Sequence, residues 1–563
     1  MTTGLRPRLF LALACFSYGR RHRIPTWPSL GRPRLLLTET IDSKPGDVHP
    51  RSSLAPALAA LTLALPAAWN GQPLFYPDTP TYLRGAEMGA TKLAGSGRLA
   101  PWMAPAAGAT AGGAAVAAPA APGLTSLDDK VVLAGRSVYY GALLYASHLA
   151  GSLWWTVAVQ AVVVAWVLHL LVVRLWGLGA PAYLGMVAAL TVATPLGVYT
   201  GLLMPDVFAG VAVLAVAMLA VHWRRLSRID RALLAGGLLF ALAGHASHVA
   251  LALALLALAL GLRLRRPAWQ GLSWAALGLV TACIAVALAA EWGFSQAVTR
   301  AVGAPPLRLP HLTGRLVDQG PGTDYLRTHC PQGHPNASPG PAPYAACAFV
   351  ANYPTTWTDF LFSTDPQRGA FALADAATKR RLSQEQLGLA MQVLRHDPAG
   401  VLRGVASDVL VQLASFRVDV WGYGPRELAM YAGRIPEGLF AAMKASRGNG
   451  TTAFNDTSTA LTYTATLAAL GLALLAARQR RLGAPAAMPH RMEQVMVLCI
   501  AGLAANALVC AALASPMDRF QSRLAWLPPM LALSALALAW RRRRATAGPQ
   551  PVPRTPVTLQ GAA

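Results

Sequence analysis

The segment that decides the fold reads MPDVFAGVAVLAVAMLAVHWRR and covers residues 204–225. Between Asp206 and the pair Arg224-Arg225 it holds no acidic or strongly basic side chain, and its apolar run approaches the length that a helix needs to cross a bilayer. A tryptophan and two arginines follow, as they do where a membrane helix ends on the cytoplasmic side. The segment therefore predicts a membrane-spanning helix with its acidic end outside and its arginine end inside.

The composition of the whole chain agrees with this prediction. Of 563 residues, 54% are hydrophobic and 13% are charged, and the mean hydropathy is +0.41, which excludes an ordinary soluble protein. A formal net charge of +24 could indicate nucleic acid as a partner. The arginines, however, crowd directly after apolar segments, for example at Arg541–Arg544. This placement follows the positive-inside rule, so we reject nucleic-acid binding.

Apolar length and arginine placement together predict an all-α polytopic membrane protein with about ten transmembrane helices, two of them short, and with both termini in the cytoplasm. The arginine-rich and alanine-rich composition is typical of a bacterium, so we expect the inner membrane. The expected spans are Leu54–Trp69, Ser152–Val173, Ala180–Tyr199, Val207–Val221, two within Leu233–Leu262, Leu272–Ala290, Thr459–Ala476, Val495–Ala514 and Leu524–Trp540.

These spans divide the chain into five parts. The expected parts are a basic cytoplasmic arm (1–52), an N-terminal transmembrane module (53–291) with a large first periplasmic loop (70–150), a mixed or helical periplasmic domain (292–457), C-terminal transmembrane helices (458–545) and a disordered cytoplasmic tail (546–563). In the arm, the apolar run Leu9–Phe16 is too brief to span a membrane. A signal peptide is the alternative, but arginines follow the run and no obvious cleavage site does.

The apolar stretch Leu233–Leu262 is too long for one helix, yet arginines flank both of its ends. The sequence Gly244-His-Ala-Ser-His248 interrupts it. We therefore expect two short helices in a hairpin. Their histidine-containing turn should lie inside the bundle or at its outer mouth, where protein or water can satisfy the backbone.

The cysteines test this topology independently. Cys283, Cys499 and Cys510 fall in apolar segments, and Cys15 falls in the basic arm. The remaining pair, Cys330 and Cys347, falls in the predicted periplasmic domain, and the periplasm is oxidising. We expect a disulfide between these two cysteines; two unpaired thiols are the alternative.

The rest of the predicted periplasmic domain is less informative. Leu382–His396 and Ala399–Leu413 have the pattern of helices, and Ser383 is the expected N-cap of the first. We expect this domain to be a structural lid, with an acceptor or lipid-head-group site as the alternative.

Two carboxylates stand at the predicted outer ends of membrane helices. Asp78 lies in the turn-rich segment FYPDTPTYLR (residues 75–84) directly after the first span, and Asp206 lies in the turn between the third and fourth spans. If those helices are neighbours, both acids lie at one membrane face. The alternative is that each aspartate only caps a turn or a helix.

This order of elements resembles the GT-C superfamily, the membrane glycosyltransferases that use polyprenyl-phosphate-linked sugars. In that family the first outer loop carries an essential acid directly after the first membrane helix, and a second acid often lies in the next outer loop. Asp78 matches the first position and Asp206 the second, although Pro77-Asp-Thr-Pro80 lacks the paired acids of several GT-C families. The resemblance implies a GT-C-like fold and sugar transfer from a polyprenyl-phosphate donor to a periplasmic acceptor.

Such a transfer needs a base for the acceptor hydroxyl and cations for the departing phosphate. We expect Asp78 to be the base and Asp206 its helper, because partial burial at the membrane boundary can raise the pKa of an aspartate. Arginine suits the phosphate because its guanidinium group binds two oxygens at once. The residues that we expect to bind substrate are Arg84, Arg136, Tyr139, His245, His248, Arg315 and Arg519, with Arg523 as a further outer arginine.

Metal binding stays open at this point. His245 and His248 are spaced so that they could share a helical face, but a hydrogen-bonded structural pair is the interpretation that we favour. We assign no metal ligand and no certain cofactor, and the resemblance leaves a divalent metal as an option.

Two other classes of function compete with the enzyme. A transporter or lipid-linked-saccharide flippase would place ionisable residues near the bilayer midplane on broken helices. The predicted spans are almost free of charge, and the Gly244–His248 break is the feature that favours transport. A non-catalytic scaffold with a GT-C-like fold is the third alternative.

Overall fold

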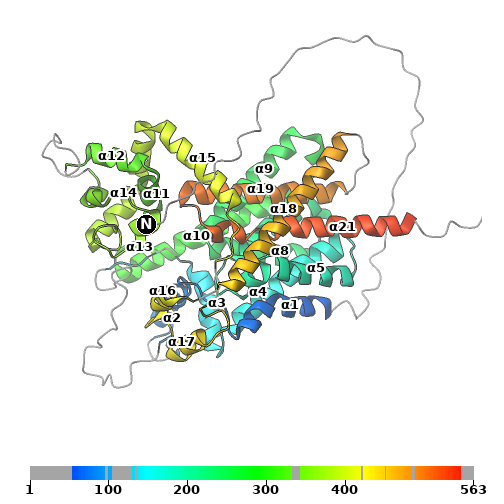
Figure 1. Ribbon diagram of the computed structural model, residues 1–563, viewed down its shortest axis with the longest axis horizontal. Coiled ribbons are helices and arrows are strands. Elements are labelled where there is room, and N and C mark those ends of the chain that lie inside the picture. Colours follow the sequence, from blue (N-terminus) through cyan, green and yellow to red (C-terminus); the bar gives the residue numbers. More distant parts are fainter. Residues whose placement is uncertain are drawn as a thin grey trace, which may run out of the picture. The chain divides into compact units, whose positions relative to one another are not determined.

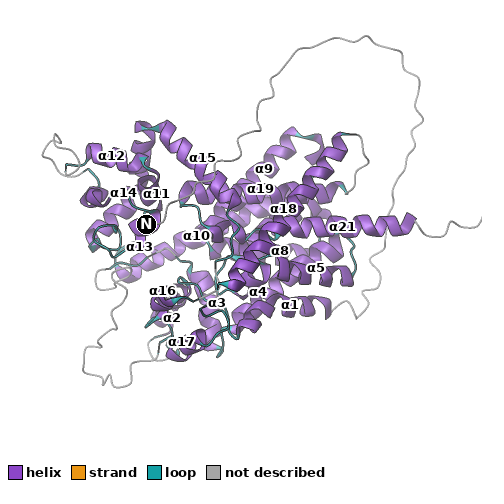
Figure 2. Cartoon of the chain, viewed as in Figure 1, coloured by secondary structure: helices purple, strands orange, loops and turns teal. Residues whose placement is uncertain are grey.

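The computed structural model describes residues 54–95, 99–103, 130–133, 136–331, 343–419, 423–450, 452–482 and 489–546. In these ranges the chain is helical and contains no strand, only two isolated bridges (Figures 1 and 2). The prediction of an all-α protein is confirmed for this part of the chain. The predicted cytoplasmic arm lies outside the described residues, as does the tail beyond residue 546.

One group of helices covers the predicted membrane spans, together with the short α20. In chain order they are α1 (Leu54–Asn70), α4 (Trp154–His169) with its π-helical continuation η2 (Leu170–Leu175), α5 (Ala180–Ala193), α6 (Leu196–Gly201), α7 (Val207–His222), α8 (Arg228–Gly244), α9 (Ala246–Arg265), α10 (Trp274–Val302), α18 (Ala453–Arg481), α19 (His490–Leu513), α20 (Asp518–Ser522) and α21 (Leu527–Thr546). The others are α2 (Thr79–Ala94), α3 (Val138–Leu149), η3 (Trp223–Arg225), η4 (Pro267–Trp269), α11 (His311–Gln319), α12 (Pro321–His329), η5 (Ala345–Asn352), α13 (Trp357–Phe362), α14 (Ala376–His396), α15 (Pro398–Ala414), α16 (Pro425–Tyr431) and α17 (Glu437–Lys444).

Seven helical segments within the described ranges are long and apolar enough to cross a membrane, which agrees with a multi-pass membrane protein. They are Trp154–Leu175, Val207–Arg225, Ala246–Arg265, Trp274–Val302, Ala453–Gln479, His490–Leu513 and Asp518–Arg544. Two further apolar helices, α1 and α5, are shorter.

The helix α7 is the centre of the bundle. Each of its residues is buried, and it packs against α4, α8, α9, α10 and α19. Close packing depends on Gly210, because a Cβ atom there would lie 2.4 Å from the ring of Trp526. The absence of a polar face on α7 therefore reflects contact with protein on every side.

One expected span is divided in two. The sequence predicted a single helix over Ala180–Tyr199, but α5 ends at Ala193, and α6 begins at Leu196. Thr194 has an extended backbone, and Pro195 has no N–H group to continue the helical hydrogen bonds. The break places the short helix α6 directly before the turn that carries Asp206.

The expected hairpin in Leu233–Leu262 is present as α8 and α9, which pack against each other. The break falls at His245, whose backbone is extended. Ser227 and Asp230 form a capping box that begins α8. Both helices are longer than we expected, and α9 is itself a candidate span.

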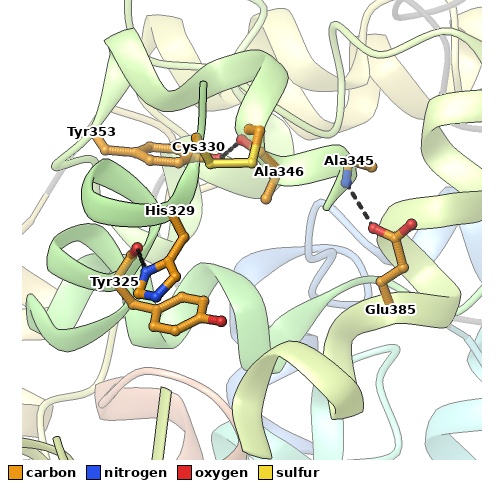
Figure 3. Close-up of a disulfide and its surroundings, with 8 residues drawn as sticks. Tyr325, His329, Cys330, Ala345, Ala346, Tyr353 and Glu385 are labelled. Carbon is orange, nitrogen blue, oxygen red and sulfur yellow. Dashed lines mark hydrogen bonds between the residues drawn. A yellow bond between two sulfur atoms is a disulfide. The ribbon is translucent and has the colours of Figure 1, made fainter. Parts of the chain in front are cut away.

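Residues between Leu309 and Val393 form a second hydrophobic core, separate from that of the bundle. It contains the predicted disulfide, because Cys330 and Cys347 are bonded and both are buried (Figure 3). Beside it, the Tyr353 hydroxyl donates to the Ala346 carbonyl. The later part of the predicted periplasmic domain behaves differently, since buried residues between Phe416 and Met443 belong to the core of the bundle.

The helix predicted at Leu382–His396 is correct in its end and wrong in its start. The structure begins α14 at Ala376, and the Asp375 carboxylate accepts a hydrogen bond from the backbone N–H of Thr378. Asp375 is therefore the N-cap. Ser383 lies inside the helix, and its hydroxyl accepts a hydrogen bond from the backbone of Arg308.

Candidate functional site

Backbone pairing holds the two predicted acids close to each other. The N–H of Leu74 donates to the carbonyl of Gly201, and the N–H of Leu203 donates to the carbonyl of Leu74, each at 2.9 Å. The Thr79 hydroxyl also donates to the Leu203 carbonyl at 3.1 Å. These bonds fasten the first loop, next to Asp78, to the turn that precedes Asp206.

Neither acid caps a helix with its side chain. Asp78 occupies the N-cap position of α2 and Asp206 that of α7, but neither carboxylate accepts a hydrogen bond from the helix that follows. The turn-capping interpretation therefore does not account for them. Both side chains instead face arginines.

Arg519 joins the two carboxylates. Its Nη1 lies 3.6 Å from Oδ2 of Asp78, and its Nε lies 3.6 Å from Oδ1 of Asp206. Arg136 donates to Asp78 at 2.5 Å, and Nη1 of Arg523 lies 3.5 Å from Oδ1 of Asp206. We call these five side chains the acid–arginine cluster.

The backbone of α20 positions the two arginines that lie four residues apart. The Asn506 amide donates to the carbonyl of Phe520, and the Tyr199 hydroxyl donates to the carbonyl of Arg519. The Arg519 guanidinium also stacks on the ring of Tyr76, with 4.2 Å between Cζ and the ring centroid. The first loop, α6, α19 and α20 therefore all contribute to placing Arg519.

The cluster contains more positive than negative charge. Three arginines face two carboxylates, so its formal charge is +1. Asp206 and Arg523 are fully buried, and the Asp78 side chain is 20% exposed. Both oxygens of Asp206 and the Nε and Nη1 atoms of Arg519 and Arg523 form no hydrogen bond with any described residue. The guanidinium nitrogens without hydrogen-bond partners, together with the excess positive charge, are suited to an anion with several oxygens, such as a phosphate.

The pKa of Asp78 differs from our expectation. Burial acts to raise this pKa, but the charges of Arg136 and Arg519 outweigh burial and hold it below the ordinary value of 3.8. The expectation of a raised pKa was therefore wrong. Asp78 is ionised at neutral pH, as a base must be, and it becomes a stronger base only when its arginines are drawn away.

No family model, curated protein or solved structure matches this chain. Within the described residues, no group of three or more His, Cys, Asp or Glu side chains could hold a metal ion.

The histidine turn reaches the cluster through its serine. The Ser247 hydroxyl accepts a hydrogen bond from Arg523 at 3.0 Å. The rings of His245 and His248 have other partners: Nδ1 of His245 caps α9 by accepting from the Ser247 N–H, and Nδ1 of His248 lies 2.8 Å from the Ala241 carbonyl. These contacts agree with the interpretation that His245 and His248 are a hydrogen-bonded structural pair.

Three other predicted substrate-binding residues have no contact with the two acids in the structure. The Tyr139 hydroxyl donates to the Ala290 carbonyl, and Arg84 is exposed on α2. Arg315 is buried and pairs with Asp408 at 3.1 Å, close to the second core. Of the predicted binding residues, Arg519 contacts both acids and Arg136 contacts Asp78.

Asn506 and Tyr76 also belong to the site, and neither was predicted from the sequence. The carbonyl oxygen of the Asn506 side chain accepts a hydrogen bond from Arg523 at 2.9 Å, and Tyr76 lies against Arg519. A signal for Asn506 was available, because a lone amide within an apolar span needs a polar partner inside the bundle. Tyr76 carried no such signal, since aromatic residues are common in turns near membranes.

Proposed function

We propose that this protein is a GT-C-like glycosyltransferase that transfers a sugar from a polyprenyl-phosphate donor to an acceptor at the membrane face opposite its arginine-rich helix ends. The observation that carries the proposal is the convergence of Asp78 and Asp206 on Arg519. The seven candidate spans, together with α1, α5 and α8, would make up the expected ten membrane helices.

In the proposed reaction, the acceptor oxygen forms a bond with the anomeric carbon of the sugar while the bond from that carbon to the phosphate oxygen breaks. The acceptor proton moves to the carboxylate of Asp78. The departing phosphate keeps the electron pair, and Arg519 and Arg136 bind its oxygens. Asp206, which is itself paired with Arg523, holds Arg519 in place from the buried side.

The excess positive charge explains how one cluster could both bind a phosphate and activate a base. In the structure, Arg136 and Arg519 bind Asp78 and keep its pKa low. A phosphate at these arginines competes for the same guanidinium groups. Part of their attraction for Asp78 is then lost, its pKa rises, and the proton transfer becomes more favourable.

The test is an assay of the full-length protein in vesicles with a panel of polyprenyl-monophosphate hexoses and pentoses. We expect the wild type to release polyprenyl monophosphate with transfer of the sugar. Asp78→Asn should lose about a hundredfold or more of this activity, because asparagine keeps the size of the side chain and removes the base. The matched control is Asp365→Asn, a surface aspartate in the loop after α13. Full transfer by Asp78→Asn would contradict the assigned base.

One observation favours the flippase alternative. The interrupted α8–α9 pair bonds through Ser247 to Arg523, which is fully buried in the candidate span Asp518–Arg544. A flippase would move the lipid-linked sugar across the vesicle membrane without breaking the bond between sugar and phosphate. Movement of intact donor, with no release of polyprenyl monophosphate, would replace the transferase proposal with this one.

A further inference from the structure

The helix α15 has its polar and apolar faces reversed relative to a helix of a water-soluble domain. Leu402 and Leu410 are 64% and 69% exposed, and Val411 and Leu413 are exposed as well. Leu402 and Leu413 lie eleven residues apart, which is close to three turns, so they share one face of the helix, and Leu410 lies beside them. In water such a face would be turned toward a core.

The opposite face of α15 carries polar residues, and these point into the protein. Asp408 pairs with the buried Arg315 and accepts a hydrogen bond from Gln319. Gln412, one turn later, is fully buried, and its amide donates to the carbonyl of Met517 while its oxygen accepts from the N–H of Met517. A helix with polar groups toward protein and apolar groups outward is adapted to an apolar surrounding.

The neighbours of α15 indicate that this apolar surrounding is lipid. It packs along α19, a candidate span (Figure 1). Just beyond the end of α15, the N–H of Phe416 donates to the Tyr463 hydroxyl of α18, a second candidate span. Both of these helices carry exposed leucines, among them Leu467 and Leu508. The outward face of α15 therefore continues a surface that lipid would cover.

Charged residues limit how deep α15 can lie. Arg403 is exposed in its first half, and the exposed Arg417 follows its end, where its N–H contacts the carboxylate of Asp518. Both ends are thus at a level where charge is tolerated. This is the pattern of a helix that lies in the membrane interface with its apolar face in the acyl chains.

We propose that α15 is an interfacial membrane helix and that the surface formed by Leu402, Leu410 and Leu413 contacts the acyl chains of bilayer lipid. The inference is independent of the proposed enzyme activity. It assigns to the membrane a helix that the sequence placed in the periplasmic domain. Because Gln412 holds Met517, the same helix fixes the chain two residues before Arg519, so a lipid-contacting element adjoins the acid–arginine cluster.

The test uses the full chain in phosphatidylcholine–phosphatidylglycerol vesicles, labelled with an environment-sensitive fluorophore at Leu410→Cys. The control site is Arg368→Cys, which is exposed in the second-core region. Protein without an introduced cysteine, labelled in parallel, gives the background from native thiols. Emission is quenched in turn by iodide in the water and by spin labels at shallow or deep positions of the lipid chains.

We expect the fluorophore at position 410 to be quenched by the shallow spin label several-fold more strongly than by iodide, and the fluorophore at position 368 to show the reverse. Strong iodide quenching at position 410 would overturn the proposal, because the face would then lie in water. Protection from both quenchers would overturn it too, since a second protein surface would then cover the face.

Discussion

The pKa of a carboxylate depends on the cations beside it, and in this protein those cations come from distant parts of the chain. Asp78 and Asp206 were identifiable from the sequence because each follows a proline at the expected end of a span. Their level in the membrane stays a prediction, whereas their closeness to each other was predictable. The low pKa of Asp78 was not, because it depends on Arg136 and Arg519, which reach the acid through the folded chain.

The pH dependence of stability tests this electrostatic description of Asp78. Because its pKa is lower in the folded protein than the ordinary 3.8, the ion pairs stabilise the fold fully above that pH and are lost as the pH falls below it. We expect the wild type to lose more thermal stability than Asp78→Asn between about pH 5 and about pH 3. The measurement is the unfolding midpoint in vesicles across that range, with Asp365→Asn as the control. Equal losses in wild type and Asp78→Asn would show that the ion pairs do not stabilise the fold.

At the scale of helices, the sequence predicted which helices are present better than the residues at which they begin and end. Apolar length was enough to find α7, α19 and the α8–α9 pair. It did not predict the end of α5 before Pro195, where proline interrupts the helix within an apolar stretch. It also did not predict that α14 begins after the N-cap Asp375. It also did not predict which side of α15 faces the protein, because the direction in which Asp408 and Gln412 point is set by tertiary contacts.

The link between α15 and α20 can be tested at Gln412. Replacing it by alanine leaves the partly buried N–H and carbonyl groups of Met517 without their partner, which should lower the free energy of unfolding by about 1 kcal/mol. The control is Gln386→Ala, because that amide donates only to a carbonyl of its own helix. Thermal unfolding of the two variants in the same vesicles gives the comparison. A Gln412→Ala protein as stable as the control would mean that this clamp does not hold α20.

At the scale of the whole molecule, the proposed function depends on the side of the membrane that the acid–arginine cluster faces. The disulfide Cys330–Cys347 is present as predicted, and it agrees with an oxidising compartment for the second core. The acid–arginine cluster lies where α7 and α20 begin, whereas Arg224-Arg225 and Arg541–Arg544 lie toward the other ends of the helical segments that contain α7 and α21. Sequence could predict this polarity from arginine placement alone, because the rule acts on segment ends and not on packing.

The sidedness of the two helix ends, measured in intact cells, tests whether the acid–arginine cluster lies on the outer side. A membrane-impermeant thiol reagent is applied to full-length protein with Asp324→Cys or Leu482→Cys, two exposed positions. We predict that the cysteine at position 324 reacts from outside and that the cysteine at position 482 reacts only after the membrane is opened. The opposite labelling would put the acid–arginine cluster at the cytoplasmic face and contradict a transferase that works on the outer side.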